Sequence, residues 1–371
     1  MTMAAANQGR FGAAFEWLGV ERAWARTFGS PNVVVGIVDE GVQLDHPLLA
    51  PNIQNPRTHH PAPSDPHEIP GTHAAGVVAG RKSDVDHFSG VAPVARLLPV
   101  RFTPGTGPQA LAHAIEHAVE MGASIINISH AADVTVPAVQ RAIQYGAARN
   151  VLVVCSAPEG SASARAADED TVPNQINVLP VGEKFEPLVA SARKSAHLAA
   201  PGFARVPRWR SNGHSVLIGA AIGAPYVSGC AALVKALNPT WGYHEIKEHL
   251  LVSATPFAEL ADHCRSASVL NVANAVLGPI ELADDARSLT WSSLSDVAIA
   301  WKLRYRPALC ANAVALYRPH GDEHWRELAF ARAHALKMTI PAAQLRRSSG
   351  TLRIACRESN FHSDEVSLTI K

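Results

Sequence analysis

Short apolar runs alternate with amphipathic segments along the first part of the chain. Residues 109–122 place Leu111, Ile115 and Val119 on one helical face, and residues 71–80 and 137–149 also fit helices. Apolar runs typical of buried parallel strands occupy residues 33–41, 96–102, 123–129 and 151–157. Strands that alternate with helices predict an α/β fold with a mainly parallel sheet and helices on both faces.

The pattern changes after about residue 277. Apolar side chains recur at every second position in residues 297–305 and 366–370. A period of two predicts antiparallel strands with one buried face. We therefore expect two domains: residues 1–278 form the α/β domain, and residues 279–371 form a small all-β sandwich.

Composition narrows the classes of function. Of the 371 residues, 47% are hydrophobic and 18% are charged, which is enough apolar material for a large core. The formal net charge of +1 gives no reason to expect nucleic acid or a membrane surface as a partner. We expect no apolar run near the ~18 residues that span a bilayer, and no signal peptide. A cytoplasmic location is predicted.

The 5 cysteines are an odd number and lie far apart, which is not typical of a disulfide framework. A reducing compartment fits this distribution best. Pairing of Cys310 with Cys356 in the second domain stays open.

Two polar residues stand where they could support chemistry. Asp39 ends the first predicted strand, just before Gly41, and an acid there can orient an imidazole. The alternative for Asp39 is a structural acid that caps a turn. His73 lies among small residues, which would let its helix pack closely and leave the ring free as a general base. Either residue alone would favour a structural role.

Together, these stretches resemble those of the subtilisin-like serine proteases (subtilases). The stretch VVVGIVDEGVQLDHPLL resembles the family's aspartate segment, and GTHAAGVVAG resembles its histidine segment. The stretches SGVAPVARLLPVRF, ASIINIS, AAPG and IGAAIGAP follow in the family's order. The resemblance implies a subtilisin-like fold, with Asp39 and His73 as the acid and base of a catalytic triad.

The nucleophile position departs from the family pattern. The family motif reads Gly-Thr-Ser-Met-Ala-x-Pro, and Gly219 and Pro225 match its ends. Ala220 replaces the threonine, and Ala221 replaces the nucleophilic serine. Because alanine has no oxygen to attack a carbonyl, acyl transfer by this route is impossible.

The expected oxyanion hole departs as well. The family segment Ala-Gly-Asn-Glu-Gly aligns with residues 156–160, so that Pro158 takes the place of the asparagine that donates to the oxyanion. Proline has neither a side-chain donor nor a backbone N–H. Loss of such a donor costs about 10²–10³ in rate. A loop shift that lets Ser156 or a backbone N–H take this role stays open.

The resemblance also implies a peptide-binding cleft. Its two sides would be formed by Gly105, Thr106 and Gly107 and by Ser129, His130 and Ala131. An open strand edge binds an extended peptide through backbone hydrogen bonds and needs no catalysis. The alternative for residues 105–107 is an ordinary turn. His130 stands where a small or apolar residue is common, which predicts a narrowed or polar pocket.

No metal, cofactor or pro-segment is expected. Residues 81–90 replace the family's usual calcium-binding loop, and Asp84 and Asp86 are expected to be solvated rather than to bind a metal. Cys155 and Cys230 are expected to be buried apolar residues rather than substitute nucleophiles.

Three functions follow from these observations. The first is a pseudoprotease that binds a peptide or partner protein in the former substrate cleft. The second is an active endopeptidase captured as a Ser-to-Ala variant, which would explain Ala221 but not Pro158. The third is a structural subunit that contacts a partner protein through the C-terminal sandwich.

Overall fold

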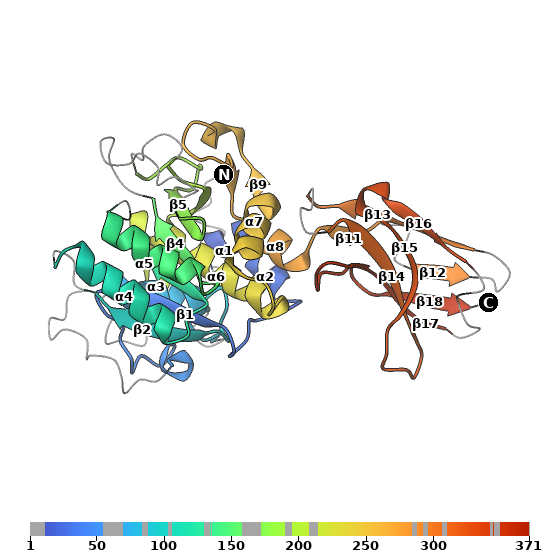
Figure 1. Ribbon diagram of the computed structural model, residues 1–371. Helices are drawn as coiled ribbons and strands as arrows, with labels where there is room; N and C mark the ends of the chain where they lie inside the picture. The colour runs from blue at the N-terminus through green and yellow to red at the C-terminus, as the bar shows by residue number, and fades with distance from the viewer. Residues whose placement is uncertain are drawn as a thin grey trace. The chain divides into compact units, whose positions relative to one another are not determined.

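The structure is a computed structural model. It describes residues 12–54, 70–83, 88–102, 106–129, 134, 136–157, 172–189, 195–207, 214–283, 288–291, 296–305, 310–341, 344 and 349–370. The chain divides into two compact units, Met1–Ala273 and Asn274–Lys371, and each is described by itself (Figure 1). The predicted domain boundary after residue 278 stays a prediction.

The first unit is built on an eight-stranded sheet with the strand order β2-β1-β3-β4-β5-β6-β10-β9. All neighbouring strands are parallel except β9 and β10. This arrangement confirms the predicted α/β fold. The strands are β1 Val34–Asp39, β2 Arg96–Arg101, β3 Ile125–Ile128, β4 Leu152–Ser156, β5 Gln175–Val181, β6 Leu198–Pro201, β9 Thr255–Pro256 and β10 Ser268–Val269. A separate hairpin pairs β7 Phe203–Pro207 with β8 His214–Ile218.

Helices cover both faces of this sheet (Figure 1). Ile126 of β3 belongs to the apolar cluster that contains Leu111 and Ile115 of α4, whereas the next residue, Asn127, bonds to Ser228 of α6. Since successive strand residues point to opposite faces, α4 and α6 lie on opposite sides. The helices of the first unit are α1 Ala13–Leu18, α2 Val20–Ala23, α3 Pro70–Ala79, α4 Pro108–Glu120, α5 Pro137–Ala147, α6 Gly223–Leu237 and α7 Tyr243–Ser253. Helix α8 Val272–Leu277 contains the division between the two units.

Helix α6 runs through the core of the first unit and contacts β3, β4, β5 and β6. Together with the turn before it, Ala220–Leu237 is the one described helical stretch long and apolar enough to cross a membrane. The expectation that no apolar run reaches that length was therefore wrong. Within the fold, 72% of this stretch is buried, and that burial accounts for its apolar composition.

The second unit contains two separate sheets. Strands β11 Ile280–Leu282, β13 Val297–Leu303 and β16 Lys337–Ile340 form one, in the order β11-β13-β16. The other has the order β12-β18-β17-β14-β15 and contains β12 Ser288–Trp291, β14 Asn312–Pro319, β15 Arg326–Arg332, β17 Gly350–Cys356 and β18 Val366–Ile370. Strand β13 buries Val297, Ile299 and Trp301 in alternation, as predicted, while Leu303 at its end is half-buried. One pair departs from the expected antiparallel pattern, because β12 and β18 run parallel. A sandwich of the two sheets stays a prediction.

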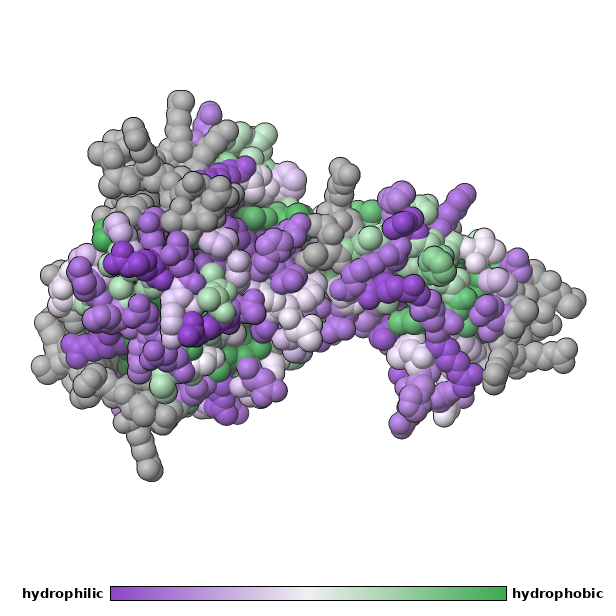
Figure 2. All heavy atoms as spheres, in the orientation of Figure 1, coloured by the Kyte–Doolittle hydropathy of each residue, from purple (hydrophilic) through white to green (hydrophobic). Residues whose placement is uncertain are grey.

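A disulfide joins Cys310 to Cys356, the pairing that the sequence left open. The other three cysteines are free and buried. Disulfides persist mainly in oxidising compartments, so this bond argues against the reducing compartment expected from the cysteine distribution. The cytoplasmic location stays a prediction. On the face drawn in Figure 2, hydrophilic side chains predominate among the described residues, with apolar residues scattered between them.

Candidate functional site

Three polar residues stand at the carboxyl ends of three neighbouring parallel strands. Asp39 ends β1, Ser129 follows β3 and Ser156 ends β4, and all three side chains are buried. Because β1, β3 and β4 are adjacent and parallel, these ends meet at one edge of the sheet, where α/β proteins place their sites. The backbone N–H of Glu40 donates to Asp39 Oδ1 at 2.8 Å and fixes that carboxylate.

The first turn of α3 packs directly on the end of β1. A Cβ added to Gly71 would lie 2.3 Å from the Gly41 carbonyl oxygen and 2.9 Å from Asp39 Cβ, so only glycine fits there. The N–H of Gln43 donates to Thr72 Oγ1 at 2.9 Å and fastens the same turn. The structure thus brings the His73 segment to the Asp39 segment, as the sequence predicted, and His73 is buried.

Small residues let α3 pack closely along its length. A Cβ on Gly76 would come within 2.2 Å of Pro207 Cδ on β7, and a Cβ on Gly80 would come within 2.4 Å of Phe88 Cε1. The close packing predicted for residues 71–80 is present. It includes contacts with the core residue Phe88 as well as with the end of β1.

Ala221 lies in a short 3-10 turn, η3 Ala220–Ile222, between β8 and α6. This turn contacts α3, the helix that carries His73. Ala221 is half-buried, whereas its neighbour Ile222 is buried. The side chain at position 221 is a methyl group, which can neither donate a hydrogen bond nor attack a carbonyl.

Ser156 connects the turn at position 221 to the sheet. Its Oγ lies 2.9 Å from the Ser129 carbonyl oxygen and 3.1 Å from the Ala220 carbonyl oxygen. A hydroxyl has one hydrogen, so Ser156 donates to one of these carbonyls at a time. Sequence reasoning did not find this connection. The only signal was a polar residue at the end of an apolar run.

A second polar connection joins α6 to the same edge. Ser228 Oγ donates to Asn127 Oδ1 at 2.9 Å, and Asn127 Nδ2 donates to Ser129 Oγ at 2.8 Å. All three side chains are buried, and each makes a hydrogen bond in this chain. Buried hydrogen-bond networks in which each side chain has a partner hold the helices and strands that they join in one relative position. Ser129 is therefore held from two sides.

Part of the predicted cleft lies outside the described residues. Pro158, Gly105, His130 and Ala131 belong to that part, so the oxyanion position and the specificity pocket stay predictions. Of the predicted edge, Thr106 is exposed and Gly107 is the N-cap of α4. Gly107 has a φ of +94°, a conformation that favours glycine.

An apolar edge stands directly before the η3 turn that contains Ala221. Val216 and Ile218 on β8 are 68% and 73% exposed, and Gly219 and the η3 turn follow them in the chain. Large aliphatic side chains exposed side by side often mark a binding surface. Sequence reasoning missed this edge because a run of consecutive apolar residues is expected to face a core.

Thiol chemistry is excluded at the two cysteines weighed as substitute nucleophiles. Cys155 and Cys230 are fully buried. Burial raises the pKa of Cys155 to about 12, and burial also raises the pKa of Cys230. A thiol kept protonated in this way is a poor nucleophile, which confirms the sequence expectation. In the described part of the chain, no three His, Cys, Asp or Glu side chains come together as a metal site. Asp84 and Asp86 lie outside that part.

Comparisons with known proteins agree with this fold. A family model described as the subtilase family matches residues 30–278, which is more than half of the chain. The chain belongs to the subtilase family. It is 29% identical over 289 residues to the major intracellular serine protease of Bacillus subtilis (strain 168), a match that covers 71% of this chain and 87% of that protein.

Two further proteins show how much of each chain is similar. The chain is 28% identical over 221 residues to the thermophilic serine proteinase of Bacillus sp. (strain AK1), covering 57% of this chain and 54% of that protein. It therefore spans about half the length of that relative. Among solved structures, MycP1 with its N-terminal propeptide removed matches with a TM-score of 0.57 and 25% identity, over 71% of this chain and 96% of that one.

Proposed function

We propose that this chain is a catalytically inactive subtilase that binds an extended peptide or partner-protein segment in the former substrate cleft. The observation that carries the proposal is the methyl side chain of Ala221 at the position where the family has its nucleophilic serine. No oxygen is present to form an acyl-enzyme, although Asp39 and His73 are retained. Pro158, at the oxyanion position, supports the same conclusion.

Peptide binding does not need the missing oxygen. A cleft edge holds an extended segment through backbone hydrogen bonds, and its affinity survives the loss of the nucleophile. The buried bonds of Ser156 and Ser129 support this proposal, because they hold the ends of β3 and β4 without any contribution from residue 221. The exposed side chains of Val216 and Ile218 add apolar surface beside the same turn.

An active endopeptidase with serine in place of Ala221 is the second candidate. The names of the similar proteins favour it, because those reported above are proteases. It accounts for Ala221 as a single substitution, but it leaves Pro158 unexplained.

Turnover of a labelled protein substrate tests the proposed function. Incubation with fluorescein-labelled casein should release no fragments above the rate in buffer, with the Bacillus subtilis intracellular protease as the positive control. Cleavage that scales with the concentration of this chain, and that disappears in His73→Ala, would replace the proposal by the endopeptidase.

A further inference from the structure

A pocket of about 460 Å³ lies in the first unit, at the amino end of β2. Arg96 begins β2, whereas Asp39 ends the neighbouring parallel strand β1. The pocket is therefore at the opposite edge of the sheet from the candidate site. Apolar and cationic side chains and one amide form its lining, namely Phe28, Pro51, Asn52, Arg81, Lys82, Pro93 and Val94.

Hydrogen bonds fix the segments that form the pocket. Asn52 Nδ2 donates to the Ala79 carbonyl oxygen at 2.7 Å and to the Pro93 carbonyl oxygen at 2.8 Å. The N–H of Val94 donates to the Phe28 carbonyl oxygen at 3.2 Å. These bonds join segments that lie far apart in the sequence, so the pocket is formed before any ligand binds.

Two stacked aromatic rings hold Lys82 beside the pocket. The rings of Phe28 and Trp24 are stacked with their centroids 5.5 Å apart. Trp24 is buried, and its Nε1–H donates to the Val91 carbonyl oxygen at 2.9 Å. Lys82 Nζ lies 5.5 Å from the centre of each ring, which is a cation–π arrangement. A positive charge is thus kept next to an apolar wall.

Positive charge predominates around the pocket. Arg81 is exposed, and it forms no ion pair with any carboxylate among the residues that the structure describes. Within two positions of a lining residue, the sequence has four cations and one acid: Arg26, Arg81, Lys82, Arg96 and Asp84. Asp84 lies outside the described residues. An excess of cations beside apolar walls favours a ligand that is both anionic and apolar.

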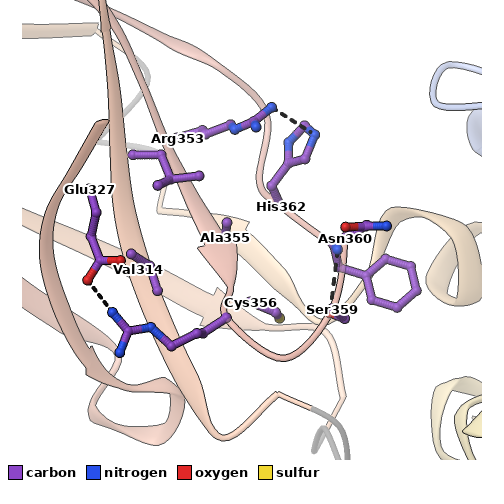
Figure 3. Close-up of a pocket in the computed structure, with 11 residues that line it drawn as sticks. Val314, Glu327, Arg353, Ala355, Cys356, Ser359, Asn360 and His362 are labelled. Carbon is purple, nitrogen blue, oxygen red and sulfur yellow. Dashed lines mark hydrogen bonds and ion pairs between the residues drawn. The ribbon is translucent and has the colours of Figure 1, made fainter. Parts of the chain in front are cut away.

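A pocket in the second unit, over β14, β15 and β17, differs in this respect (Figure 3). There Glu327 pairs with Arg357, and Arg353 Nη1 lies 3.1 Å from His362 Nε2. Its polar side chains bond to one another. The guanidinium of Arg81 has no such partner among the described side chains, so it remains available to a ligand.

We propose that the pocket at the amino end of β2 binds the C-terminal residue of a partner protein, where that residue is apolar. The terminal carboxylate accepts hydrogen bonds from Arg81, with Lys82 alongside, and the apolar side chain contacts Phe28 and Pro93. A C-terminal residue carries both groups on one Cα, so both fit into one small pocket. An internal glutamate would need a second residue to supply the apolar side chain.

The rim of the pocket favours a protein chain over a small acid. Phe28 and Val94 are 39% and 40% exposed. The residues that precede a C-terminal residue would cover these two side chains, and burial of their apolar surface adds to the affinity. This site is separate from the cleft of the proposed function and does not depend on it.

Fluorescence anisotropy with the full chain tests the proposal. The probe is a dye-labelled pentapeptide, Gly-Ser-Gly-Ser-Leu, with a free C-terminal carboxylate, and the comparison peptide ends in an amide. The acid should bind about fivefold more tightly than the amide, the scale of one well-formed exposed ion pair. Equal affinity for the two peptides would overturn the proposal.

Two further ligands separate a terminal residue from other acids. The same pentapeptide with a C-terminal serine should bind at least about tenfold more weakly, because it loses the burial of a leucine side chain. Free N-acetyl-leucine should also bind more weakly, because it does not reach the rim at Phe28 and Val94. N-acetyl-leucine that binds as tightly as the leucine pentapeptide would show a site for small acids and contradict the proposal.

Substitutions locate the site. Arg81→Gln should remove the preference for the acid over the amide, and it should fold because the Arg81 side chain is exposed. Arg22→Gln is the matched control, because Arg22 is exposed on α2 and does not line the pocket. It should change the affinity for the acid less than about twofold.

A second variant tests the rim. Val94→Asp places a carboxylate beside the bound one, so it should weaken binding of the acid more than binding of the amide. A melting curve checks that each variant is folded. A full preference for the acid in both Arg81→Gln and Val94→Asp would mean that the carboxylate binds elsewhere, and the proposal would fail.

Discussion

Ser156 Oγ lies 3.1 Å from the carbonyl oxygen of Ala220, so a buried hydroxyl at the end of β4 contacts the backbone directly before position 221. The same hydroxyl lies 2.9 Å from the Ser129 carbonyl oxygen at the end of β3. The turn that would present a nucleophile is thus positioned from the interior of the sheet. Neither contact involves the side chain at position 221.

Removal of this hydroxyl should loosen the site. Ser156→Ala should lower the free energy of unfolding by about 1 kcal/mol, the usual net value of one buried hydrogen bond. Ser253→Ala is the matched control, because this buried serine lies on α7 and donates to the Leu250 carbonyl oxygen of the same helix at 3.4 Å. Denaturant unfolding measures both. Equal losses in the two variants would show that Ser156 has no special part in the site.

Bulk at the exposed edge of the cleft should block peptide binding. Thr106→Trp places a large side chain at an exposed position and should weaken binding of a recovered partner peptide about tenfold, the scale of one or two lost backbone bonds. Gly107→Trp is less informative, because the φ of +94° at Gly107 would strain any other residue. Calorimetry on wild type and Thr106→Trp measures the effect. Equal affinity would move the interaction away from the cleft.

His197 should make the first unit sensitive to acid. Burial, followed by Lys247 and Arg265, lowers the pKa of His197 to about 3. Between that value and the ordinary pKa of about 6.5, the unfolded chain binds a proton that the folded chain does not, so stability falls as pH falls. The slope from this residue is at most about 1.4 kcal/mol per pH unit.

A variant separates this contribution from that of other groups. The N–H of Asn177 donates to His197 Nδ1 at 2.9 Å, and His197→Asn keeps a side-chain acceptor without a titrating ring. Unfolding free energies between pH 4 and pH 7 should converge for wild type and variant as the pH falls. Parallel curves would contradict the assigned role of His197.

Substitutions at positions 221 and 158 should raise kcat/KM in two steps. Ala221→Ser restores the nucleophile but leaves Pro158 without a donor, so its kcat/KM should stay far below that of an ordinary subtilase. Addition of Pro158→Asn should then raise kcat/KM about 10²–10³-fold. Hydrolysis of a peptide p-nitroanilide measures both variants. Full turnover from Ala221→Ser alone would mean that other groups form the oxyanion hole.

Strands β1 to β4 could be predicted because each lies in a continuous apolar run. Helices α4 and α5 could be predicted from their amphipathic patterns, and α3 from its run of small residues. Strand β5 was missed because Gln175 and Asn177 interrupt its apolar pattern, although both are buried and bonded to each other at 2.6 Å. A polar side chain can be buried when another side chain accepts or donates its hydrogen bond. The pattern of apolar and polar residues along the chain does not reveal such a partner. The parallel pairing of β12 with β18 was missed for a related reason, since period two does not fix strand direction.

The candidate site divides in the same way. The segments of Asp39, His73 and Ala221 could be singled out in the sequence because each resembles a family motif within a few consecutive residues, and their catalytic roles stay predictions. The contact of Ser156 with Ala220 could not, since it joins residues 64 positions apart. The exposed edge at Val216 and Ile218 was also missed, because apolar residues in a strand pattern are expected to face a core.

Labelling by a fluorophosphonate tests the central claim most directly, because the reagent forms a covalent bond only with an activated serine. Intact-mass spectrometry of the wild-type chain should show no added mass after prolonged incubation, with Ala221→Ser treated in parallel. Stoichiometric labelling of the chain with Ala221 in place, at any residue near Asp39 and His73, would contradict the account.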